Sequence, residues 1–151
     1  EELCRKIEPH VSTTRERFEV LMRCKELGIP TLVWMTPILP FINDTRENIE
    51  GLLDYCLLAG VRGILVFDVG VTLREGDREY FYQALDRDFP GIRQKYISTY
   101  GNAYDIPSPY AKELMALIQN TCVANGMLCS PKECFTYLHE FPERYVQQTL
   151  F

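Results

Sequence analysis

Two stretches of the chain repeat one pattern, and this repeat limits the possible folds more than any other feature. The sequences LGIPTLVWMT (27–36) and AGVRGILVFD (59–68) each carry a glycine, a short turn, an apolar run and a polar residue. A helical pattern precedes each copy, and the copies lie about 32 residues apart. Continuous apolar runs are typical of strands that are buried on both faces of a parallel sheet. The repeat therefore predicts consecutive βα units of a parallel sheet or barrel.

Capping residues mark where the helices begin. Thr13 opens a helix over 12–27 with a capping box, and Ser130 opens a late helix in the same way. Asp44 is followed three residues later by a glutamate, so it is predicted to be the N-cap of the helix that ends at Ala59. Ser108, followed by proline, is predicted to be the N-cap of a helix that runs to about 123.

The number of strands is too small for a closed barrel. The usual enzyme barrel has about eight strands and about 250 residues. We therefore predict an α/β fold, an incomplete (β/α) TIM-type barrel with a helical C-terminal extension. The βα units occupy 1–75, the helical extension 76–142 and a tail 143–151. The first residue is not Met and lies within a helical pattern, so we interpret the chain as part of a longer protein whose missing half lies upstream.

Composition excludes some classes of protein and leaves others open. The net charge of −5 and the isoelectric point near 5.1 provide no basic footprint for nucleic acid. No run approaches the roughly 18 apolar residues of a membrane span. The charged N-terminus lacks the apolar region of a signal peptide, so we expect a cytoplasmic location, no membrane contact and reduced cysteines.

Polar residues follow both predicted strands at the end where α/β proteins bind their ligands. Thr36 ends the first strand, Asp68 ends the second, and Asn43 lies in the loop after the first. These side chains are expected to line a ligand site at the carboxyl edge of the sheet. The alternative, for the neighbouring Asp44, is that it serves only as an N-cap. Three late cysteines, spaced C-x6-C-x4-C from Cys122, lack the C-x2-C pairs of a typical zinc site and are interpreted as structural thiols.

Two further patterns each leave an alternative open. Four tyrosines at 96, 100, 104 and 110 form either a stacking surface for bases or part of a small core. The chain ends in QQTLF, which resembles the bacterial sliding-clamp-binding pentapeptide at Gln147, Leu150 and Phe151. The alternative is that this tail docks on its own core.

The first third of the chain resembles the spore-photoproduct-lyase-like branch of the radical S-adenosylmethionine proteins. The residues that carry the resemblance are Ile7-Glu8-Pro9, Arg17, Gly28-Ile29-Pro30 and the run from Pro37 to Asp44, PILPFIND. Phe41 departs from the family pattern, in which glycine is common at this position. That departure affects how closely the loop backbone can approach a ligand.

The resemblance implies the C-terminal part of an enzyme with a partial barrel. The parent enzyme would bind a [4Fe-4S] cluster through a C-x3-C-x2-C loop and would cleave S-adenosylmethionine to abstract hydrogen from a substrate. By the same resemblance, Thr36, Pro37, Ile38, Asn43 and Asp68 would contact the cofactor, and damaged DNA is a possible substrate. No three cysteines of this chain have the cluster spacing, so we expect neither cofactor nor activity in the chain alone.

Two other functions stay open. One is a non-catalytic interaction protein that forms a homodimer or binds a sliding clamp through its last residues, since an incomplete barrel leaves apolar surface uncovered. The other is a different TIM-barrel enzyme that uses Asp68 as an acid or base.

Overall fold

The computed structural model describes residues 1–140, which form seven helices and four short strands. In chain order these elements are α1 (Glu2–Ile7), α2 (Thr14–Glu26), β1 (Leu32–Trp34), α3 (Arg46–Ala59), β2 (Gly63–Leu65), β3 (Gly70–Thr72), α4 (Asp77–Asp88), α5 (Ile92–Tyr100), β4 (Asp105–Pro107), α6 (Ala111–Ala124) and α7 (Pro131–His139). None of these helices is long and apolar enough to cross a membrane.

The two predicted repeats form the parallel pair β1 and β2. Trp34 lies opposite Leu65 in their register. A third segment extends this sheet, because Leu128 forms a parallel bridge with Gly63. The Ile64 N–H donates to the Leu128 carbonyl at 2.8 Å. The repeats therefore form parallel βα units as predicted, and the third parallel segment is an addition that the sequence pattern did not indicate.

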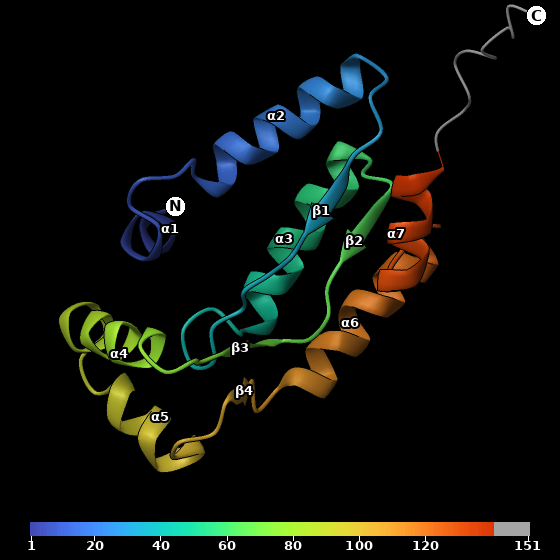
Figure 1. Cartoon of the computed structure of the whole chain (residues 1–151). Coiled ribbons are helices and arrows are strands. Elements are labelled where there is room, and N and C mark those ends of the chain that lie inside the picture. Colours follow the sequence, from blue (N-terminus) through green and yellow to red (C-terminus); the bar gives the residue numbers. More distant parts are fainter. Residues whose placement is uncertain (141–151) are drawn as a thin grey trace, which may run out of the picture.

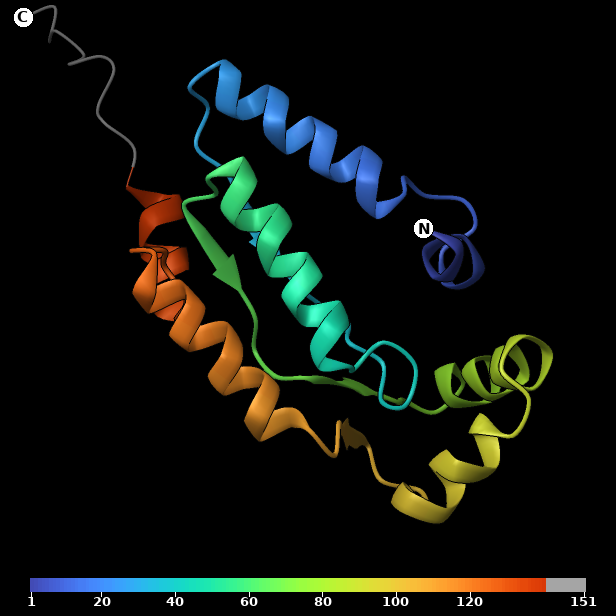
Figure 2. The ribbon, with the colours of Figure 1, turned by 180° about the vertical axis from the view of Figure 1, so that it is seen from behind.

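Helices cover one face of this sheet. The helix α3 packs against α2 and α6, and the side chains between these helices and the sheet form the main core. Figure 1 looks onto β1 and β2 with α3 behind them, and in Figure 2, from behind, α3 passes in front of β1. Fully buried members of the main core include Ile49, Leu53, Ile64, Val66 and Ile118. Burial of each such aliphatic side chain contributes about 1.5–3 kcal/mol to folding.

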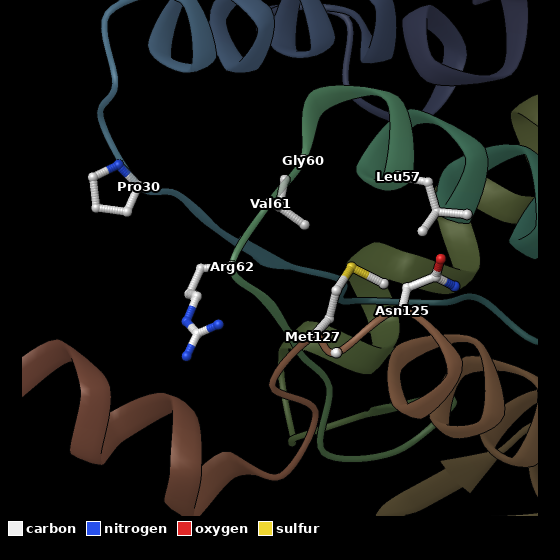
Figure 3. A pocket seen from close by; sticks show the side chains of 8 residues that line it. Pro30, Leu57, Gly60, Val61, Arg62, Asn125 and Met127 are labelled. Atoms are coloured by element: carbon white, nitrogen blue, oxygen red, sulfur yellow. The ribbon is translucent and has the colours of Figure 1, made fainter.

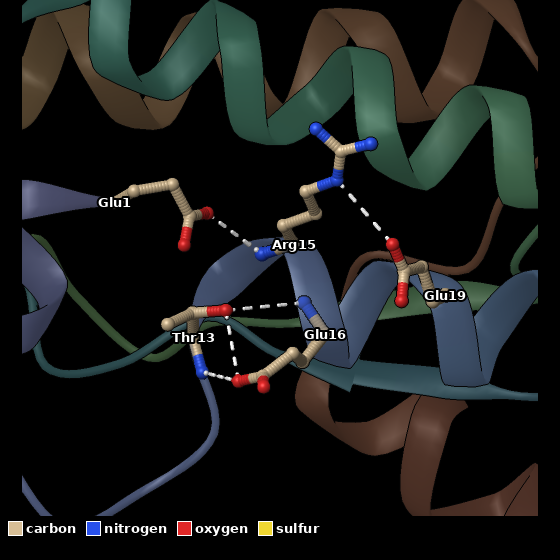
Figure 4. Close-up of polar contacts among 5 residues, drawn as sticks. All are labelled: Glu1, Thr13, Arg15, Glu16 and Glu19. Atoms are coloured by element: carbon tan, nitrogen blue, oxygen red, sulfur yellow. Dashed lines mark hydrogen bonds and ion pairs between the residues drawn. The ribbon is translucent and has the colours of Figure 1, made fainter.

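The start of α2 has the predicted capping box. The Glu16 backbone N–H donates to the Thr13 hydroxyl at 3.3 Å, and the Thr13 N–H donates to the Glu16 carboxylate at 2.7 Å (Figure 4). The Glu1 carboxylate accepts a further bond from the Arg15 N–H at 2.9 Å. The Ser130 capping box at the start of α7 is confirmed as well.

Residues 70–107 form a second small core beside the first. The antiparallel strands β3 and β4 pair there, and α4 packs against α5 around Leu85, Tyr96 and Ile106. Arg78 of α4 links α4 to the segments beside β3 and β4, since its guanidinium donates to the carbonyls of Ala103 at 2.6 Å and Leu73 at 3.1 Å. The segment predicted as one helical extension thus contributes α4 and α5 to the second core and α6 to the main core.

Two of the predicted N-caps are wrong, and the two residues bond to each other instead. The N-cap of α3 is Thr45, whose hydroxyl accepts from the Asn48 N–H at 3.2 Å. Asp44, one residue earlier, is 2% exposed and accepts a hydrogen bond from the Ser108 hydroxyl at 2.5 Å. That hydroxyl also accepts from the Tyr110 N–H at 3.0 Å, and α6 begins only at Ala111. Asp44 and Ser108 therefore join the starts of α3 and α6.

Candidate functional site: the open face of the parallel strands

The face of β1 and β2 opposite α3 carries exposed aromatic side chains. Paired residues of parallel strands point to the same side, so Val33 and Ile64 pack into the main core while Trp34 points to the other face. Trp34 and Phe67 are each 57% exposed. The prediction of strands buried on both faces is therefore wrong for Trp34 and Phe67, although Leu65, which is paired with Trp34 on the same side, is 3% exposed.

Phe135 of α7 completes an aromatic trio on this face. Its ring centroid lies 6.5 Å from that of Trp34 and 6.4 Å from that of Phe67, and the Trp34 and Phe67 centroids are 5.7 Å apart. These separations are those of interacting aromatic pairs. Adjoining exposed rings form an apolar patch, which on a protein surface typically marks a binding site. We call Trp34, Phe67, Phe135 and the exposed polar strand ends beside them the open face.

The polar strand ends lie where the sequence places them. Thr36 and Pro37 are exposed after β1, and Asp68 is exposed after β2. One oxygen of the Asp68 carboxylate accepts from the Val69 N–H at 2.7 Å, which holds the side chain beside its own backbone. Within residues 1–140, the other oxygen of this carboxylate has no protein hydrogen-bond donor. The open face therefore combines flat apolar surfaces with a hydroxyl and a carboxylate.

The other two predicted site residues serve the loop and the core. Ile38 is 2% exposed and belongs to the main core. The Asn43 side-chain oxygen accepts from the Leu39 N–H at 2.5 Å, and the Asn43 backbone carbonyl accepts from the Asn48 side chain at 2.8 Å. Both residues thus shape the loop between β1 and α3. Phe41, in the same loop, adopts a positive φ of 64°, a conformation that glycine adopts more readily than other residues.

The three residues of the aromatic trio were not among the site residues predicted from the sequence. A signal was present, because each strand places an aromatic residue one or two positions before its terminal polar residue, as in Phe67 and Asp68. Phe135 carries no such signal, since only the packing of α7 against β2 brings it to this face.

The four tyrosines do not form one stacking surface. Tyr96 is fully buried and its hydroxyl donates to the Pro40 carbonyl at 2.8 Å, and burial raises its pKa. Tyr100 donates to the Pro107 carbonyl at 2.6 Å. The Tyr104 hydroxyl lies 3.4 Å from the Arg74 guanidinium, which lowers the tyrosine pKa. The core alternative therefore holds for Tyr96.

A separate hollow of about 380 Å³ lies at the opposite end of the strands (Figure 3). It is bordered by residues that precede β1 and β2 and by the end of α6, among them Pro30, Arg62 and Asn125. Ligands of parallel α/β folds bind at the carboxyl ends of strands, so the open face remains the candidate site.

Two predictions concern metals and the C-terminal tail. Within residues 1–140, no group of three or more His, Cys, Asp or Glu side chains is arranged to hold a metal ion. The predicted clamp-binding residues Gln147, Leu150 and Phe151 lie outside the described residues, so that function stays a prediction.

Comparison with known proteins yields relatives whose names describe them as uncharacterized proteins. Proteins from Mycobacterium tuberculosis strains H37Rv and CDC 1551 and from Mycobacterium bovis are 29% identical to the chain over 113 residues. The match covers 75% of this chain and 33% of each relative, so it spans about a third of the relatives' length. No protein-family model and no solved structure matches the chain.

Proposed function

We propose that the chain is the C-terminal part of a radical S-adenosylmethionine enzyme of the spore-photoproduct-lyase-like group. The observation that carries the proposal is the open face, where an exposed aromatic surface lies beside the strand ends of two parallel βα units. The PILPFIND motif of the resemblance leads directly from that edge into α3. A cytoplasmic location belongs to the proposal and is consistent with six free cysteines.

The proposal assigns the rest of the barrel to sequence outside this chain. Parallel barrels bury both faces of their strands, whereas Trp34 and Phe67 are more than half exposed here. Further strands packed beside β1 would cover these rings, with a gain of about 1.5–3 kcal/mol for each large side chain that becomes fully buried. The mycobacterial relatives are long enough to contain such strands, since the match spans a third of their length.

The residues of this chain do not fit the iron–sulfur cluster. Cys56, Cys122 and Cys134 are buried in the interior, and burial raises the pKa of the Cys56 thiol to about 11, which disfavours the thiolate that binds iron. The proposal therefore assigns the cluster ligands to the missing half, and no step is derived through the cluster.

The open face does fit S-adenosylmethionine. The rings of Trp34 and Phe67 offer flat surfaces for an adenine, and Thr36 and Asp68 offer groups that can hydrogen-bond the ribose hydroxyls. The negative charge of Asp68 also attracts a sulfonium. When bound in the whole enzyme, the cofactor supplies a radical that abstracts hydrogen from the substrate. The resemblance suggests damaged DNA as that substrate, although the net charge of −5 gives no basic surface for it.

The test uses the complete reading frame that encodes this chain. The protein is purified without oxygen, supplied with iron and sulfide and reduced, and formation of 5′-deoxyadenosine from S-adenosylmethionine is measured. We expect a C-x3-C-x2-C sequence upstream, product formation, and at least a tenfold weaker cofactor affinity in Asp68→Asn. The matched control Asp54→Asn, on α3, should behave as the unchanged protein. Absence of the cysteine motif or of the product would refute the proposal.

Self-association is the second candidate function, and the exposed aromatic trio favours it. In a dimer, each copy of the chain would cover the open face of the other copy. This function would not need any residues beyond those of the present chain. Sedimentation of residues 1–151 should then give a dimer that Trp34→Ser weakens. Val20→Ser is the control, because Val20 is 63% exposed on α2. A chain that stays monomeric at high concentration contradicts this candidate.

A further inference from the structure

The hollow at the starts of β1 and β2 combines apolar walls with one charged side chain. Its volume of about 380 Å³ falls within the usual range of small-molecule sites, about 300–1,000 Å³. Pro30, Leu57 and Met127 are apolar parts of the wall (Figure 3). Among the described residues that line the hollow, Arg62 is the only charged one. Because the whole chain has a net charge of −5, this hollow is a local exception that favours an anion.

Backbone pairing and an aromatic ring hold Arg62 in place. The Arg62 N–H donates to the Thr31 carbonyl at 2.8 Å, and the Arg62 carbonyl accepts from the Leu128 N–H at 3.0 Å. Arg62 thus joins the starts of β1, β2 and the third segment. Its guanidinium carbon lies 5.6 Å from the centre of the Tyr137 ring on α7, a cation–π distance. A guanidinium over a ring keeps the N–H groups at its edge free, and a carboxylate can accept from them bidentately.

The positive charge of Arg62 has no acidic partner within residues 1–140, since none of the ion pairs found there includes it. The helix ends that border the hollow have donors of their own. At the end of α3, the Lys25 ammonium donates to the Leu58 carbonyl at 2.6 Å. At the end of α6, the Asn125 side chain donates to the Thr121 carbonyl at 2.8 Å. Because other groups serve these carbonyls, the Arg62 guanidinium is available to a ligand.

The backbone of the wall favours a carboxylate over a phosphate. Phosphate sites typically use several backbone N–H groups that point at the ligand. In this wall the N–H groups of Gly60, Val61 and Gly126 already donate to protein carbonyls, at 3.0, 3.2 and 3.3 Å. The head of a ligand therefore depends on side-chain donors, and a single guanidinium matches the planar shape of a carboxylate.

We propose that the hollow binds a small carboxylate with an apolar body, such as a medium-chain fatty acid. The carboxylate accepts hydrogen bonds from the Arg62 guanidinium, and the hydrocarbon body packs against Leu57 and Met127. A second cation borders the same wall, since the Lys25 nitrogen would lie 3.8 Å from a Cβ at Gly60. The site lies at the opposite end of the strands from the open face and does not depend on the proposed enzyme function.

Nuclear magnetic resonance of the full chain tests the site, because the amides of Gly60 and Gly126 lie in its wall. Isotope-labelled protein is titrated with octanoate, with acetate, which is the head alone, and with octanol, which replaces the charge by a hydroxyl. We expect octanoate to shift both glycine signals to saturation. Acetate and octanol should each bind more weakly by about tenfold or more, since each lacks one of the two interactions. Equal affinity of either compound and octanoate would overturn the proposal.

Two matched variants test the role of the guanidinium. Arg62→Gln should weaken octanoate binding by about tenfold or more, the usual loss for a charged hydrogen bond, and should leave octanol binding unchanged. Arg15→Gln removes another exposed arginine, at the start of α2, and should bind octanoate as the unchanged protein does. Circular dichroism confirms that both variants are folded. Unchanged octanoate affinity in Arg62→Gln, or signal shifts confined to the open face around Asp68, would overturn the proposal.

Discussion

Replacement of Asp44 by alanine tests how the two starts of α3 and α6 are joined. Asp44 is 2% exposed and Ser108 is 5% exposed, with 2.5 Å between the carboxylate and the hydroxyl. A hydrogen bond to a charged group contributes about 1.5–3 kcal/mol, and the substitution also leaves the Ser108 hydroxyl without its acceptor. We therefore expect Asp44→Ala to lower the free energy of unfolding by about 2–3 kcal/mol. In a domain of this size, this corresponds to a fall in Tm of about 6–9 °C.

Thr45→Ala provides the comparison, because it removes the N-cap that the structure assigns to α3. Loss of an N-cap hydroxyl costs about 1 kcal/mol, or a fall in Tm of about 3 °C. Unfolding in urea, followed by circular dichroism, measures both variants. The double variant of Asp44→Ala with Ser108→Ala should lose clearly less stability than the sum of the two single losses. Additive losses, or a larger loss in Thr45→Ala than in Asp44→Ala, would refute this assignment and restore Asp44 as the cap.

Two further predictions concern the sheet and the second core. Gly63→Ala should destabilise the protein by about 1–3 kcal/mol, because a Cβ at this position would lie 2.7 Å from atoms of Leu128 in the third segment. Gly51→Ala in α3, where the space around the glycine is open, should instead stabilise the protein by up to about 1 kcal/mol. Equal effects of the two substitutions in urea unfolding would contradict this packing. Arg78→Lys should cost about 1–2 kcal/mol although it keeps the positive charge, since an ammonium cannot reproduce the two bonds to the carbonyls of Leu73 and Ala103, which lie just after β3 and just before β4. Full stability of this variant would refute that role.

Local signals in the sequence were enough to predict most of the helices and the two parallel strands. Helix starts with a complete capping box, such as those at Thr13 and Ser130, could be predicted because all the bonds lie within four residues. The two βα repeats were also predictable, since their apolar runs and glycine stops are local signals. The polar strand ends Thr36 and Asp68 followed from the same pattern, and both lie exposed at the edge expected of a ligand site.

The tertiary structure decided how these elements use their side chains. Asp44 had a complete local signal for an N-cap, but it bonds to Ser108, 64 residues away, because the packing of α3 and α6 brings the two together. The short strands β3 and β4 lie more than 30 residues apart and form only because they pair with each other. Cys129 packs against the main core because the segment before it joins the sheet at Leu128. The apolar run around Trp34 predicts a core residue, yet Trp34 lies on the open face and is 57% exposed. Burial depends on what covers a strand, and an apolar run alone cannot specify that.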